Sequence, residues 1–174
     1  MPQRNHLQIY DTATPSGLNA GPPLQTFFDA YPTFTYDPSG SPIHEFGRMC
    51  QFFGWHNAYT TARKKAYTAF RRALVDEFNA KFGTDANKLA PWRALCQTIG
   101  ISPIPESVTK CKKAMKAVHV NLVDLVDPSL ANKKIHKFRN VHELAAYTQE
   151  TGKIFPKNAA KAGGVLKYLL REIF

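Results

Sequence analysis

One long stretch of this sequence carries an uninterrupted helical pattern, and it limits the fold more than any other feature. Between Tyr59 and Phe82, apolar side chains recur every four residues, and Gly83 follows directly as a helix stop. These apolar residues are Ala66, Phe70, Leu74, Phe78 and Phe82. An apolar face of this length is unstable in water, so the pattern predicts a long amphipathic helix that other helices cover.

Shorter helix patterns lie on both sides of this stretch. Ser41 as the cap and Pro42 at the first helical position predict a helix that ends at Gly54. Thr84 or Asp85 is a suitable cap for a helix whose apolar positions include Trp92, Leu95 and Cys96, and which stops at Gly100.

The second half of the chain repeats these signals. Pro105 and Glu106 suit the start of a helix with Val108, Cys111, Met115 and Val118 on its inner face. Asn140 and Glu143 form a capping box for the next helix, which Gly152 ends. After a break at Pro156, Gly163 and Gly164 open a final helix with an apolar face of Val165, Leu166, Leu169, Leu170 and Ile173.

The segment from His119 to Asp127 is ambiguous, because short valine-rich runs suit either a buried helix, here capped by Asn121, or a strand. Pro128 closes it in both cases. Residues 132–139 form a basic connector from which Ile135 and Phe138 reach inward.

The beginning of the chain differs in composition. Residues 1–42 hold seven of the twelve prolines and show little periodicity, which predicts an extended Pro-rich N-terminal arm. We expect residues 1–22 to be a flexible tail and residues 23–174 to be the helical domain. Aromatic side chains between Phe27 and Tyr36 are costly to expose, so this part lies along the core or docks on a partner.

These patterns predict an all-α fold, a single compact domain of six or seven helices. The hydrophobic fraction of 44% is sufficient for a packed core. The sequence has no internal repeat, which argues against a solenoid.

The net charge of +10 is the strongest compositional indication of function. Residues 1–102 hold ten Lys and Arg against seven Asp and Glu, whereas residues 103–174 hold thirteen against six. A surface that attracts anions therefore belongs to the second half.

The leading hypothesis is a non-enzymatic binding module that contacts nucleic acid, DNA or RNA, or another polyanion, mainly through phosphates. No zinc-finger, homeodomain or RNA-binding motif indicates reading of bases. The lysines expected at this site are Lys110, Lys112, Lys113, Lys116, Lys133, Lys134, Lys137, Lys153, Lys157 and Lys161.

Two alternatives stay open. In the first, the chain is a protein-interaction module that uses the aromatic N-terminal arm, and its charge serves solubility. In the second, it is a small hydrolase or nuclease that uses Asp124 and Asp127, three residues apart, with a histidine. No GxSxG motif, complete phosphate-binding loop or metal-ligand spacing is present, so we expect no cofactor and no metal.

Three widely spaced cysteines, Cys50, Cys96 and Cys111, occupy apolar positions of helical patterns, which indicates buried reduced thiols. Reduced thiols favour an intracellular protein, nuclear or cytoplasmic. No run approaches the ~18 apolar residues of a membrane span, and the N-terminus lacks the apolar run of a secretory signal.

Three blocks of the sequence resemble a domain of uncharacterised fungal proteins. They are YPTFTYDPSGSPIHEFGRMCQFFGW, HVNLVDLVD and TGKIFPKNAAKAGGVLKYLLREIF, in that order, and they span residues 31–174. The resemblance implies a recurring module and a fungal setting, and it implies no activity or cofactor. The chain before the first block is variable in that pattern, in agreement with a tail over residues 1–22.

Overall fold

The structure, a computed structural model, describes residues 21–55, 60–157 and 164–170. Within these ranges it is all-α, with six α-helices and no β-strand. The helices are α1 (Pro23–Asp29), α2 (Pro42–Phe52), α3 (Thr61–Phe82), α4 (Leu89–Ile99), α5 (Val108–Lys116) and α6 (Val141–Thr151). Two short 3-10 helices are η2 (Pro128–Leu130) and η4 (Leu166–Tyr168).

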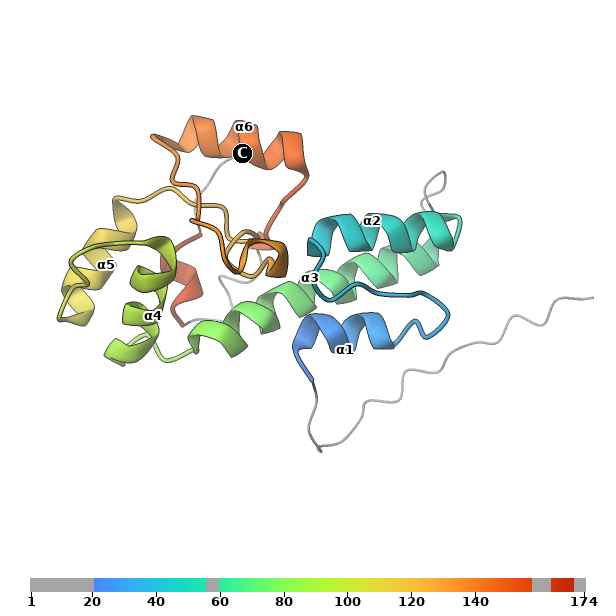
Figure 1. Cartoon of the computed structure of the whole chain (residues 1–174), viewed down its shortest axis with the longest axis horizontal. Coiled ribbons are helices and arrows are strands. Elements are labelled where there is room, and N and C mark those ends of the chain that lie inside the picture. Colours follow the sequence, from blue (N-terminus) through green and yellow to red (C-terminus); the bar gives the residue numbers. More distant parts are fainter. Residues whose placement is uncertain (1–20, 56–59, 158–163, 171–174) are drawn as a thin grey trace, which may run out of the picture.

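Helix α3 is the element around which the others are arranged. Figure 1 shows α1 and α2 beside its first half, and α4 and α5 at its far end. The side chain of Thr60 caps α3 by accepting a hydrogen bond from the backbone N–H of Arg63, and Gly83 follows its last residue. The predicted apolar face is confirmed, since all five of its side chains are buried.

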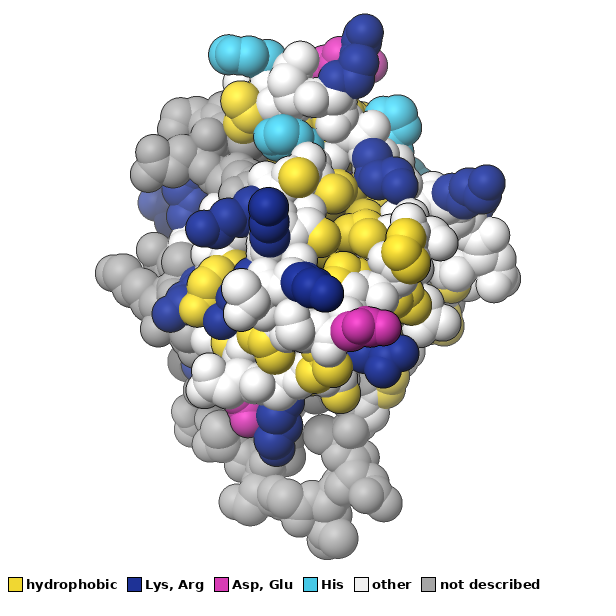
Figure 2. Space-filling model, turned by 90° about the vertical axis from the view of Figure 1, so that its left-hand side faces the viewer, with side chains coloured by type: hydrophobic (Ala, Val, Ile, Leu, Met, Phe, Trp, Pro, Cys, Tyr) yellow, Lys and Arg dark blue, Asp and Glu magenta, His cyan; other side chains and the backbone are white. Residues whose placement is uncertain are grey.

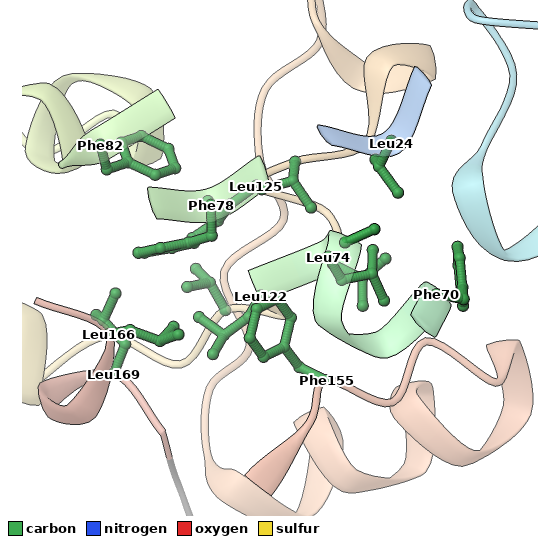
Figure 3. Packing of buried hydrophobic residues seen from close by; sticks show 14 of the residues in the cluster. Leu24, Phe70, Leu74, Phe78, Phe82, Leu122, Leu125, Phe155, Leu166 and Leu169 are labelled. Carbon is green, nitrogen blue, oxygen red and sulfur yellow. The ribbon is translucent and has the colours of Figure 1, made fainter. Parts of the chain in front are cut away.

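The core forms where α3 meets the last third of the chain. Figure 3 shows Phe78 of α3 near Leu122, Phe155 and Leu166, which come from three different segments. The rings of Phe78 and Phe155 lie 6.2 Å apart in an edge-on arrangement. The long helix is therefore covered by residues that lie far from it in the sequence.

Aromatic packing fixes the first part of the chain on α2 and α3. Phe27 lies 5.5 Å from Phe70 between ring centroids, and Phe28 stacks on Tyr36 at 4.0 Å. The expectation that these aromatics lie along the core is confirmed. The expected arm is a folded helix and loop from Pro23 onward, while residues 1–20 lie outside the described residues.

Two predicted helix starts lie too early in the sequence. Helix α4 begins at Leu89, because the carboxylate of Asp85 accepts the backbone N–H of Asn87 at 2.9 Å and forms a local turn there. Helix α5 begins at Val108, where the hydroxyl of Ser107 accepts the backbone N–H of Lys110 at 3.3 Å. Hydrogen bonds accepted by the side chains of Asp85 and Ser107, just before the two helices, therefore determine where α4 and α5 begin.

The segment from His119 to Asp127 is neither of the two predicted structures. It is a buried series of turns, and the side chain of Asn121 organises it. The amide oxygen of Asn121 accepts the N–H of Val123 at 2.9 Å, and its amide nitrogen donates to Thr148 Oγ1 at 3.0 Å and to the carbonyl of Lys153 at 2.9 Å. An amide with these partners provides the turns with the hydrogen bonds that a helix or a strand would otherwise supply.

The final helix is shorter than predicted within the described residues. One 3-10 turn, η4, follows Gly164, while Gly163 and residues 171–174 lie outside the described part of the chain. Gly164 has φ +70°, and an added Cβ would stand 2.5 Å from the carbonyl oxygen of Thr84. A glycine is therefore required there for close approach of two backbone segments.

The three cysteines are free and buried, as the sequence predicts. Burial raises the pKa of the Cys96 thiol to about 12, and the neighbouring Cys111 adds to this effect. The two thiols join α4 to α5 as small apolar groups.

Candidate nucleic-acid interface

Helix α5 presents lysines to solvent because its other face is in the core. Cys111 and Met115 are buried, and the hydroxyl of Ser107 caps the first turn. Two of the lysines lie in the last turn, where a cation also interacts favourably with the helix dipole. The exposed lysines of α5 are Lys110, Lys113 and Lys116.

A second group of lysines lies on the segment that precedes α6. Ile135 and Phe138 are buried, as predicted, and they anchor the segment. The backbone N–H of Phe138 donates to the carbonyl of His119 at 2.8 Å, and Lys137 Nζ donates to the carbonyl of Gly100 at 3.2 Å. These bonds tie the segment to the chain that follows α5 and to the end of α4. Its exposed lysines are Lys133, Lys134 and Lys137.

We define the basic surface as the exposed side chains of residues 107–139. This part of the sequence has two acidic residues, Asp124 and Asp127, and each is only 3% exposed. The charge that it exposes is therefore positive throughout. Figure 2, which looks onto the end of the molecule with α4 and α5, shows Lys and Arg distributed over this face and sparse acidic side chains.

The two buried carboxylates hold Lys153. The Lys153 ammonium lies 2.6 Å from Asp124 Oδ1 and 3.2 Å from Asp127 Oδ2, and the lysine side chain is only 14% exposed. Tyr147 Oη donates to Asp124 Oδ1 at 3.2 Å, and Ser129 Oγ donates to Asp127 Oδ1 at 2.6 Å. Lys153 is thus part of a buried ion cluster, separate from the basic surface.

Two opposing effects determine the pKa of Lys153 in this cluster. Burial lowers the pKa, and the hydrogen bond and charge of Asp124, with the charge of Asp127, more than offset it, so the pKa is raised overall. The ammonium is held in its charged form, and it neutralises one of two carboxylates. An ammonium engaged by two buried carboxylates in this way is unsuited to contact an external phosphate.

Lys112 also has a different role from the one expected. Its ammonium lies 4.5 Å from the centroid of the Tyr168 ring and 5.7 Å from that of Trp92, and it donates to Tyr168 Oη at 3.4 Å. The hydrogen bond and charge of Lys112 lower the pKa of Tyr168. Lys112 therefore covers the aromatic edge of the core. Of the other predicted lysines, Lys157 is exposed beyond α6, and Lys161 lies outside the described residues.

Arg139 and Lys81 are two further cations at or near this surface, and neither was among the predicted site residues. Arg139 belongs to the predicted basic connector, and its Nε lies 2.7 Å from Glu143 Oε1. Lys81 suggests a helical pair with Glu77, yet its ammonium donates to the carbonyl of Leu125 at 2.8 Å. Glu77 instead accepts the backbone N–H of Leu24, at the start of α1. No local pattern predicts either long-range bond.

A polar cavity of about 340 Å³ adjoins the basic surface. Lys81 at the end of α3 and Lys133 on the segment before α6 line it, together with Asp124 and Asp127 from the turns after α5. The described residues contain no group of three or more His, Cys, Asp or Glu that could bind a metal. The helices described here include none long and apolar enough to cross a membrane.

Comparisons with protein-family models, with curated proteins and with solved structures found no match. The resemblance to a fungal domain therefore stays an expectation based on its three sequence blocks.

Proposed function

We propose that this protein is a binding module for nucleic acid, and that the basic surface contacts the phosphate backbone. The observation that carries the proposal is the segregation of charge within residues 107–139. The lysines there are exposed on α5 and on the segment before α6, while both aspartates are buried against Lys153.

This arrangement suits a polyanion for an electrostatic reason. Lysines that neutralise phosphates displace the cations condensed on the nucleic acid, and the release of these cations favours binding at low salt. An exposed aspartate among the lysines would repel the phosphates and reduce the gain. The fold avoids this repulsion by turning Asp124 and Asp127 inward.

The two alternative functions receive less support. The aromatic side chains of Phe27, Phe28 and Phe34 are buried in the core, so they are not a free arm for a protein partner. Asp124 and Asp127 are occupied by Lys153, which favours a structural role over acid or base catalysis. Nucleic acid as the partner would place the protein inside the cell, in the nucleus or the cytoplasm.

Fluorescence anisotropy with a labelled DNA duplex tests the proposal. The variant Lys110→Gln/Lys113→Gln/Lys116→Gln should weaken binding at least about tenfold at low salt, and should reduce the slope of log K against log salt by about 0.9 for each lost phosphate contact. Glutamine favours helix nearly as well as lysine, so α5 should persist.

The matched control removes three cations from the first half of α3, far from the basic surface. Lys64→Gln/Lys65→Gln/Arg72→Gln lowers the net charge by the same amount, and these side chains are exposed. The proposal expects this control to keep most of the affinity. Equal losses in both variants, or no binding of any nucleic acid by the intact protein at low salt, would contradict it.

A further inference from the structure

We infer that the basic surface accepts a double helix, of DNA or RNA, in preference to a single strand. This inference rests on the proposed function and adds the form of nucleic acid that the surface fits. Two observations carry it, namely that the basic surface exposes no Phe, Tyr or Trp ring, its one exposed imidazole, that of His136, being packed against Phe138, and that its lysines are carried by fixed elements.

Proteins that bind single strands combine cations with exposed aromatic rings on which bases stack. Phe138 is the only Phe, Tyr or Trp between Ser107 and Arg139, and it is 9% exposed. Its ring packs against Tyr147 at 4.9 Å and against His136 at 4.4 Å. The basic surface thus has lysines that can contact phosphates, and it has no exposed Phe, Tyr or Trp ring on which bases could stack.

Exposed aromatic side chains in the described part of the chain lie elsewhere. Phe52 on α2 is 57% exposed and Tyr67 on α3 is 41% exposed. Figure 1 shows the end of α2 and the first half of α3 at the opposite end of the molecule from α5. Near α5, the ring of Tyr168 is covered by Lys112 at 4.5 Å and by Lys167 at 5.1 Å.

The lysines are carried by fixed elements. Helix α5 packs on α4 through the buried side chains of Cys96 and Cys111. The hydrogen bond from Phe138 N–H to the carbonyl of His119 joins the second group of lysines to the chain just after α5. Because the backbone that carries these lysines is fixed, the protein loses little conformational entropy when it binds a duplex, whose phosphates are also regularly placed. A flexible single strand, in contrast, loses conformational entropy when it is ordered on the surface.

The test compares four probes of equal length at several salt concentrations: a DNA duplex, an RNA duplex, a single strand, and the same single strand with abasic sites. Duplexes carry a higher density of phosphates, so any polycation prefers them. A hexalysine peptide measured on the same probes provides the reference. The inference predicts that the protein prefers one or both duplexes over the single strand at least about tenfold more strongly than the peptide does.

The abasic probe tests directly whether the bases contribute to the affinity. The inference predicts equal affinity for the two single strands, within about twofold, because stacking of one base on a ring would raise the affinity by about fivefold or more. Thr109→Trp, which puts a ring on the exposed face of α5, is the positive control and should strengthen binding of the normal single strand only.

The results distinguish failure of the duplex inference from failure of the proposed function. Single-strand affinity that equals or exceeds duplex affinity, or that falls on the abasic probe, overturns the inference and leaves the proposed function in place. Failure to bind any of the probes overturns the proposed function itself. The two duplex probes show whether B-form DNA, A-form RNA or both fit the surface.

Discussion

Removal of the Lys153 ammonium should cost the fold considerable stability. Its ammonium lies within 3.2 Å of both Asp124 and Asp127, which are almost completely buried. Removing one partner of a buried ion pair leaves uncompensated charge, which costs about 3 to 5 kcal/mol. We expect Lys153→Met to lower the free energy of unfolding by that amount, measured by urea denaturation at pH 7.

The same substitution at an exposed lysine is the control for this prediction. Lys134→Met on the segment before α6 should change the free energy of unfolding by about 0.5 kcal/mol or less. If Lys153→Met is as mild as the control, the ion cluster has no stabilising role.

The pH dependence follows from the raised pKa of Lys153. A lysine whose pKa is higher in the folded than in the unfolded protein stabilises the fold fully below its unfolded pKa of about 10.4. This contribution is lost as the pH rises above that value and through the folded pKa. The difference in stability between the intact protein and Lys153→Met should therefore stay constant up to about pH 10, and should shrink progressively once the pH exceeds the unfolded pKa of lysine.

Gly164 and Gly100 form a natural pair for a test of close packing. Both have positive φ, +70° and +72°, so alanine is strained at either position by about 1 to 2 kcal/mol. An added Cβ at Gly100 meets open space, whereas at Gly164 it meets the backbone of Thr84 at 2.5 Å. Gly164→Ala should lower the melting temperature clearly more than Gly100→Ala. Equal effects would mean that the contact with Thr84 relaxes at little cost.

At the scale of whole elements, the helix caps make an equally direct test. Asn140 Oδ1 accepts the N–H of Glu143 at 2.9 Å at the start of α6, whereas Ser41 at the start of α2 makes no such bond. Loss of a bonded cap costs about 1 kcal/mol. Asn140→Ala should reduce the free energy of unfolding by that amount, and Ser41→Ala by much less. A larger loss at Ser41 would contradict the assigned caps.

Elements with strong periodicity could be predicted from the sequence, and others could not. The four-residue spacing of α3 is a local property, and so is the Asn140 cap of α6, although the Glu143 carboxylate accepts the backbone N–H of Arg139 and does not complete the predicted capping box. The turns around Asn121 depend on Thr148 and on the carbonyl of Lys153, which lie 27 and 32 residues away in the sequence. A pattern within a few residues contains no information about such partners.

Local sequence patterns also predicted only part of the candidate site. The exposed lysines of α5 could be predicted because Cys111 and Met115 define the buried face of that helix. Lys153 and Lys112 look similar in the sequence, yet one pairs with Asp124 and the other covers Tyr168. Only the packing of separate segments decides which lysines are occupied.

At the scale of the molecule, the basic surface and the exposed rings of Phe52 and Tyr67 lie at different ends of α3. Helix α5 and its lysines occupy one end, and the exposed ring of Phe52 lies at the end of α2 at the other (Figure 1). The buried aspartates keep negative charge away from the basic surface. We therefore expect nucleic acid to contact the basic surface, and we expect α2 and the first half of α3 to lie outside the contact.

Lysine footprinting shows which face of the protein a duplex covers. The protein is acetylated briefly with and without a saturating DNA or RNA duplex at low salt, and the modified lysines are quantified by mass spectrometry. The account predicts protection of the six lysines exposed on the basic surface and none of Lys64 and Lys65, with Lys153 slow to react in both states. Protection confined to Lys64 and Lys65, or spread evenly over all exposed lysines, would contradict it.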